Sequence, residues 1–108
     1  MTQGQLAEQQ AKEHLQQQGL TFVAANVRFK FGEIDLIMQD DNTLVFVEVK
    51  FRKSEAFGGA LNALSAKQIH RIRCCAQAYI QQHNINPNCR FDVIAINNRQ
   101  INWIKGCF

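Results

Sequence analysis

Two carboxylates and a lysine in neighbouring predicted strands are the residues of this chain whose types and spacing could do chemistry. In a symmetric hairpin that turns at residues 41–42, Asp35 lies directly opposite Glu48, and Glu33 lies opposite Lys50. Like charges that face each other destabilise an antiparallel strand pair. A divalent cation bound between Asp35 and Glu48 would remove this repulsion. The pattern therefore predicts a metal site at one end of a central hairpin.

Alternation along the two strands predicts which side chains share a face. Glu48 and Lys50 are two residues apart and share one face, as do Glu33 and Asp35. We expect the opposite face to be apolar and to consist of Ile34, Leu36, Val47, Val49 and Phe51. The charged group then lies at the edge of the core.

Hydrophobic periodicity, capping residues and turns predict the elements that must position these side chains. We expect helices over residues 4–18 and 65–84, and strands over residues 20–31, 32–39, 43–52, 90–97 and 100–105. Gly19 ends the first helix, and a capping box of Ser65 and Gln68 begins the second. The order α-β-β-β-α-β-β predicts one α/β domain over residues 1–108, with helices flanking a central mixed sheet.

Composition excludes several classes of protein. The longest apolar stretch, residues 44–49, is interrupted by Glu48, so we predict no membrane span. The first residues show neither the basic nor the apolar region of a secretion signal. The four cysteines, at positions 74, 75, 89 and 107, lack the spacing of zinc ligands. We therefore expect a cytoplasmic protein with reduced thiols and no zinc.

The charges are unevenly distributed along the chain. Residues 1–49 carry three Lys or Arg and seven Asp or Glu, whereas residues 50–108 carry nine and two. This division suits a polyanionic substrate that basic groups hold beside an acidic, metal-loaded centre. The alternative is an ordinary, mildly basic protein.

Four basic residues are candidates for binding DNA. Lys67 and Arg71 lie one helical turn apart near the start of the second helix, where the backbone amides also favour a phosphate. A merely solvated helix face is the alternative for this pair. Arg52 and Lys53 directly follow the strand that carries Lys50.

Asp35 followed by Glu48-Val49-Lys50 resembles the D…(D/E)xK signature of the PD-(D/E)xK nuclease superfamily, with Ile34 in place of the signature's proline. More closely, the chain resembles the small YraN-like bacterial family, which is related to archaeal-type Holliday-junction resolvases. The matching stretches are residues 26–28, 32–37, 45–52, 57–58 and 90–93, and the apolar C-terminus, residues 106–108.

The resemblance implies a restriction-endonuclease-like fold and a Mg²⁺- or Mn²⁺-dependent endonuclease that acts on DNA, including branched or otherwise structured DNA. Asp35 and Glu48 would be metal ligands, together with the carbonyl of Val49 and with Glu8 in the first helix. Lys50 would orient or help to deprotonate the attacking water and stabilise charge on the phosphate. Superfamily chemistry would leave a 5′-phosphate and a 3′-hydroxyl, and the resolvase relatives imply a homodimer.

Other interpretations of the same residues remain open. Asp35 and Glu48 could form salt bridges with Lys50 or Arg52 and bind no metal, and Glu33 could serve to orient Lys50. The chain would then be a scaffold protein, or a nucleic-acid-binding module without turnover.

Asp92 stands among apolar neighbours in the fourth predicted strand. We interpret it as a structural partner of Arg90, Arg28 or Arg52, and a role in catalysis is the alternative.

Overall fold

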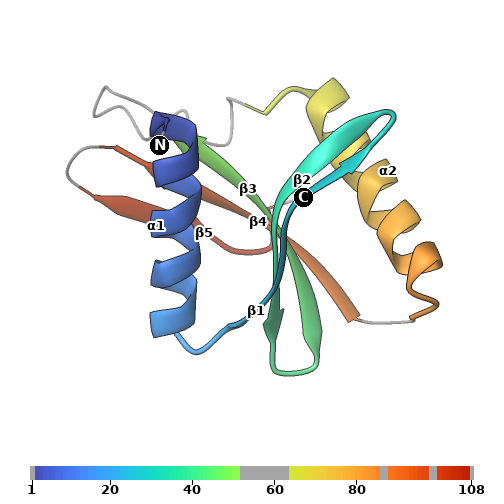
Figure 1. The fold of residues 1–108 in the computed structure, drawn as a ribbon, viewed down its shortest axis with the longest axis horizontal. Coiled ribbons are helices and arrows are strands. Elements are labelled where there is room, and N and C mark those ends of the chain that lie inside the picture. Colours follow the sequence, from blue (N-terminus) through green and yellow to red (C-terminus); the bar gives the residue numbers. More distant parts are fainter. Residues whose placement is uncertain (1, 52–63, 86–87, 98–99, 108) are drawn as a thin grey trace.

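Five strands form one mixed sheet with a helix on each face, as the sequence predicted (Figure 1). The computed structural model describes residues 2–51, 64–85, 88–97 and 100–107. The strand order is β1-β2-β3-β4-β5; β3 and β4 are parallel, and the other neighbours are antiparallel. The elements are α1 (Gln3–Gln17), β1 (Thr21–Phe29), β2 (Gly32–Asp40), β3 (Thr43–Phe51), α2 (Ala66–Gln82), β4 (Asn88–Ile96) and β5 (Ile101–Ile104).

Both helices begin with a capping box. The predicted box of Ser65 and Gln68 starts α2, and Thr2 and Gln5 form a second one at the start of α1. Gly19 follows α1 with a left-handed φ of 98°, which fits its predicted role at the helix end. The order of the predicted elements is confirmed, and their bounds shift by a few residues at most.

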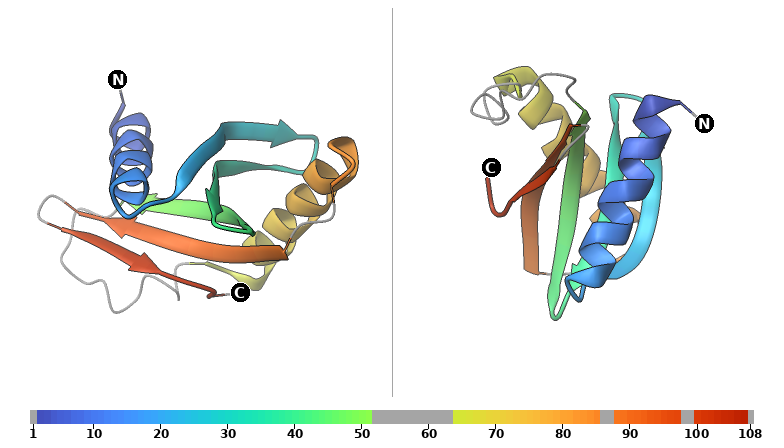
Figure 2. Two further views of the ribbon diagram at one scale, coloured as in Figure 1. Left: turned by 90° about the horizontal axis from the view of Figure 1, so that it is seen from below. Right: turned by 90° about the vertical axis from the view of Figure 1, so that its left-hand side faces the viewer.

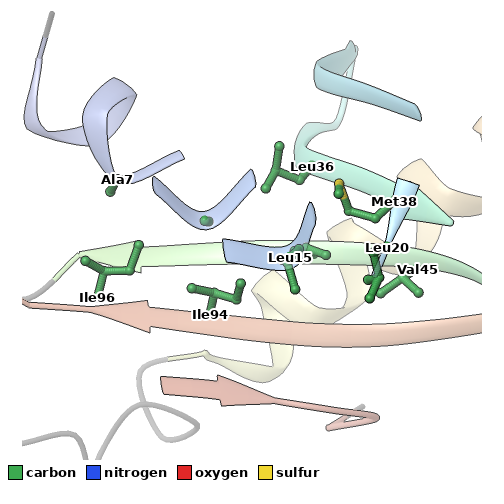
Figure 3. Packing of buried hydrophobic residues seen from close by; sticks show 10 residues of the cluster. Ala7, Leu15, Leu20, Leu36, Met38, Val45, Ile94 and Ile96 are labelled. Atoms are coloured by element: carbon green, nitrogen blue, oxygen red, sulfur yellow. The ribbon is translucent and has the colours of Figure 1, made fainter. Parts of the chain in front are cut away.

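Two apolar clusters, one on each face of the sheet, hold the helices in place. Val45 and Val47 pack toward α1, whereas Leu44 and Phe46, which alternate with them along β3, pack toward α2. Figure 3 shows the α1-side cluster from close by. Its buried members are Ala7, Ala11, Leu15, Leu20, Leu36, Met38, Val45, Val47, Ile94 and Ile96. Of the helices in the described ranges, none is long and apolar enough to cross a membrane.

Asp92 is fully buried in β4 and accepts four hydrogen bonds. Arg90 donates two of them, from Nε and Nη2, at 2.9 Å each, which confirms Arg90 as the predicted structural partner. Trp103 Nε1 and the backbone N–H of Gly106 donate the other two, also at 2.9 Å. Arg90 in turn reaches Asp40 at the end of β2, at 3.0 Å. The Asp92 carboxylate therefore connects β4 with β5 and the segment after β5, and it connects β4 with β2 through Arg90.

Replacing Asp92 with alanine should lower the free energy of unfolding by about 3–5 kcal/mol, because it leaves the partly buried Arg90 charge without its main partner. Urea denaturation of wild type and variant measures this difference. The exposed substitution Glu13→Ala should stay within about 0.5 kcal/mol of wild type. A loss below about 1 kcal/mol for Asp92→Ala would show that the network adds little stability.

Candidate metal centre

The β2–β3 hairpin brings Asp35 to Glu48. The predicted register holds up to the pair Leu36↔Val47. Beyond this pair, a side-chain contact links the two strands. The backbone N–H of Val49 donates a hydrogen bond of 2.9 Å to Oδ2 of Asp35. Its carboxyl also shares a hydrogen bond with that of Glu48. The two acids therefore meet where the sequence placed them.

The backbone of β2 rotates at Asp35. Leu36 packs in the α1-side cluster, whereas Ile34 packs in the α2-side cluster, although a regular strand would put both on one face. Our expectation that Ile34 shares a face with Leu36 is therefore wrong. Directly across the strand pair, Asn26 stands at the level of Asp35 with a left-handed φ of 52°. Asn tolerates this conformation better than most residues.

Among the described residues, two further acids, Glu8 and Glu33, lie close to Asp35, and Glu48 is not part of this group. One carboxylate oxygen each from Glu8, Glu33 and Asp35 lies within 4.8 Å of the others. Glu8 therefore sits beside Asp35, as the family resemblance implied. Glu33 forms an ion pair with Arg28 at 3.7 Å, and no described ion pair joins it to Lys50, so the expected orienting role is not found.

Asn26 is a site residue that the sequence analysis did not single out. With its NH₂ group turned toward the acids, the orientation that satisfies both sides of the amide, it donates to Glu33 Oε1 at 2.8 Å and to Glu8 Oε1 at 3.0 Å. The available signal was an asparagine in the middle of a strand whose other residues are mostly apolar or small, because Asn is depleted in strands.

The close packing of acids changes their protonation. The pKa of Asp35 rises to about 8, because burial, the hydrogen bond with Glu48 and the Glu48 charge disfavour the ionised form; the Val49 amide and the Lys50 charge oppose the rise. Burial and the charges of Asp35 and Glu33 also raise the pKa of Glu8, against the hydrogen bond from Asn26. The close packing of these acids therefore favours the protonated, uncharged forms of Asp35 and Glu8.

The predicted basic residues are placed unequally. Arg71 lines a surface cavity of about 150 Å³ together with Glu33, Glu48 and Gln68. Lys67 is exposed in the first turn of α2 but does not line that cavity. The predicted DNA contacts Arg52 and Lys53 lie outside the described residues.

The donor set fits a hard divalent cation. Asp35, Glu8 and Glu33, whose oxygens lie within 4.8 Å of one another, offer carboxylate ligands, and Glu48 adds a further carboxylate through its contact with Asp35. Carboxylate oxygens are the ligands that Mg²⁺ and Mn²⁺ prefer. Burial, the hydrogen bond with Glu48 and the Glu48 charge raise the pKa of Asp35 to about 8, and the nearby Lys50 charge offsets this only in part. A dication would favour the ionised form of each acid.

The comparisons with known proteins place the chain in a family. A protein from Shewanella frigidimarina is 65% identical and one from Shewanella denitrificans is 57% identical, and both alignments cover all of both chains. A relative from Shewanella halifaxensis is 54% identical over 98% of this chain and 94% of its own length. All three are named UPF0102 proteins. The family model described as "Uncharacterised protein family UPF0102" matches residues 7–96, and the chain therefore belongs to UPF0102, the YraN-like family that its sequence resembles.

Proposed function

We propose that this protein is a divalent-cation-dependent endonuclease that hydrolyses DNA phosphodiesters, branched or structured DNA included. The observation that carries the proposal is the meeting of Asp35 and Glu48 beside Lys50, where partial burial and Glu48 together raise the pKa of Asp35 to about 8. Sites that bind a cation or a phosphate concentrate acids in partly buried positions, and such packing raises the pKa of an acid.

Asp35 and Glu48 would hold Mg²⁺ or Mn²⁺, assisted by Glu8 and the Val49 carbonyl. The cation would neutralise charge on the phosphodiester and promote the loss of a proton from water. Lys50 would donate hydrogen bonds to the attacking water and to a non-bridging phosphate oxygen, where negative charge grows during the reaction. The water oxygen attacks phosphorus as the bond to the 3′-oxygen breaks, which leaves a 5′-phosphate and a 3′-hydroxyl.

Arg71 and Lys67 would hold the DNA backbone on the α2 side. Arg71 already lines the cavity that contains Glu48, so a phosphate in that cavity would meet a guanidinium. Lys67 lies one turn earlier and would contact a neighbouring phosphate. A symmetric junction needs two cuts, and a homodimer with two such sites would supply them.

The test is incubation of the purified protein with labelled four-way junction, flap, single-stranded and duplex DNA, in Mg²⁺, Mn²⁺ or EDTA. Wild type should cut at least one of the branched substrates in either cation and none in EDTA. Glu48→Gln should abolish cutting while folding and binding persist. Asp41→Asn, which changes an exposed acid at the hairpin turn, is the matched control and should cut as wild type does.

Two results would favour the other interpretations. DNA binding in EDTA without cleavage in either cation would make the protein a nucleic-acid-binding module. Neither binding nor cleavage would leave a scaffold protein whose acids are structural.

A further inference from the structure

The tip of the β1–β2 hairpin alternates basic and aromatic side chains. Its sequence is Arg28-Phe29-Lys30-Phe31, and Lys30 and Phe31 form the two-residue turn after the last strand pair, Phe29↔Gly32. Figures 1 and 2 show this tip, in cyan, on the side of the molecule where α2 lies. A Cβ atom added at Gly32 would lie 3.6 Å from the Arg71 side chain, so the hairpin tip and α2 are close together.

The aromatic ring of Phe31 is exposed to solvent and stacks on a second ring, that of Phe29. Its exposed fraction, 48%, is the largest of the exposed large apolar residues in the described ranges. The ring stacks on that of Phe29, with centroids 5.9 Å apart and planes only 8° from parallel. Phe29 is itself packed against the α2-side cluster. The Phe31 ring is therefore supported by a ring that packs on the core, and nearly half of its surface is open to solvent.

The ring is flanked by cations. Arg28 has 79% of its side chain exposed, and Lys30 in the turn is also exposed. The nearest acid in sequence, Glu33, pairs with Arg28 at 3.7 Å. An aromatic face between positive side chains suits a nucleic acid, because the cations attract phosphates and the ring stacks with a base.

The tip also adjoins the candidate metal centre. Gly32 and Glu33, directly after Phe31, line the cavity that holds Glu48 and Arg71. Strand residues advance by about 3.3 Å each, so Phe31 and Glu33 are about 7 Å apart along the chain. A phosphate in the cavity would have its neighbouring nucleotide within reach of the Phe31 ring.

We infer that Phe31 is a stacking platform for an unpaired nucleobase next to the phosphodiester held at the metal centre. The inference rests on the proposed function and narrows its substrate class to DNA with an unpaired base beside the cut, as at a flap, gap or open branch point. A base inside a duplex already has neighbours on both faces and cannot occupy the platform. Fully paired DNA would gain only the backbone contacts of the cations.

The test is equilibrium binding, by fluorescence anisotropy in EDTA, of labelled DNA with a single-stranded flap and of the matched full duplex. Wild type should bind the flap DNA about 10-fold more tightly than the duplex, in line with the energy of one stacked base. Phe31→Ala should abolish this preference by weakening flap binding alone. Phe31→Trp should keep it, and stacking should quench the fluorescence of the introduced indole.

Ile85→Ala is the control, because Ile85 is a comparably exposed apolar residue, 40%, at the far end of α2. Urea denaturation should show each variant to be folded. Flap binding by Phe31→Ala at wild-type strength, equal losses on flap and duplex, or the absence of any wild-type preference would each overturn the platform.

Because binding is measured in EDTA, the outcome does not depend on turnover. If the protein cleaves DNA but shows no flap preference that depends on Phe31, the proposed nuclease function stands and the stacking role of Phe31 is wrong. If the flap preference depends on Phe31 but no DNA is cleaved in Mg²⁺ or Mn²⁺, the stacking role of Phe31 stands and the proposed nuclease function is wrong.

Discussion

Lys50→Ala should slow DNA cleavage by about 100- to 1,000-fold, because it removes the cation that stabilises charge on the phosphate in the transition state. Lys50 lies near enough to Asp35 for its charge to oppose the rise of the Asp35 pKa to about 8, so the amine is close to the candidate metal centre. Single-turnover cleavage at saturating protein and Mn²⁺ measures the chemical step.

Binding of the uncut substrate in EDTA should change far less than the rate of cleavage. Lys105→Ala, which removes an exposed cation just after β5, is the matched control and should cut at the wild-type rate. A Lys50→Ala protein that cuts at the wild-type rate would show that this lysine is only a counter-ion of the acids.

Asp35→Asn should stabilise the cation-free protein while it abolishes cleavage. Asn can still accept from the Val49 amide and can donate to Glu48, so the local hydrogen bonds survive without the partly buried acid. The pKa of Asp35 is about 8 in the folded chain and 3.8 in the unfolded chain. Between these two pH values, the folded chain therefore binds the Asp35 proton more tightly than the unfolded chain does. The free energy of unfolding of wild type should therefore fall as pH rises from about 4 to about 8, by up to about 1.4 kcal/mol per pH unit.

The stability that protonated Asp35 contributes is complete below the unfolded pKa and is lost as pH rises through the folded pKa of about 8. At pH 8 the Asp35→Asn protein should be more stable than wild type by a few kcal/mol, on the order of 3. Urea denaturation at several pH values in EDTA measures both curves. Asp41→Asn should follow the wild-type curve, and an Asp35→Asn curve with the wild-type slope would contradict the assignment.

The fold could be predicted from the sequence because its signals are local. The capping box of Ser65 and Gln68, the left-handed Gly19 and the turn at residues 41–42 each fix an element end without help from the rest of the chain. Once the turn is fixed, period-two alternation sets the β2–β3 register, and with it the meeting of Asp35 and Glu48.

The rest of the site depends on an irregularity that periodicity does not contain. The rotation of β2 at Asp35 and the left-handed Asn26 beside it break the alternation from which we placed Ile34 and Glu33. Glu8 could be placed only by family resemblance, since nothing in the sequence fixes how α1 docks on the sheet. The position of Arg71 in the cavity likewise follows from the packing of α2.

Calorimetric titration of the metal-free protein with Mn²⁺ at pH 7 tests the metal centre most directly. Wild type and Asp41→Asn should bind Mn²⁺ at a single site and release close to one proton, because Asp35, with a pKa of about 8, must lose its proton to become a ligand. The released proton appears as a dependence of the binding heat on the ionisation enthalpy of the buffer. Asp35→Asn and Glu48→Gln should bind at least about 10-fold more weakly. No binding by wild type, or undiminished binding by Glu48→Gln, would contradict a metal centre at these acids.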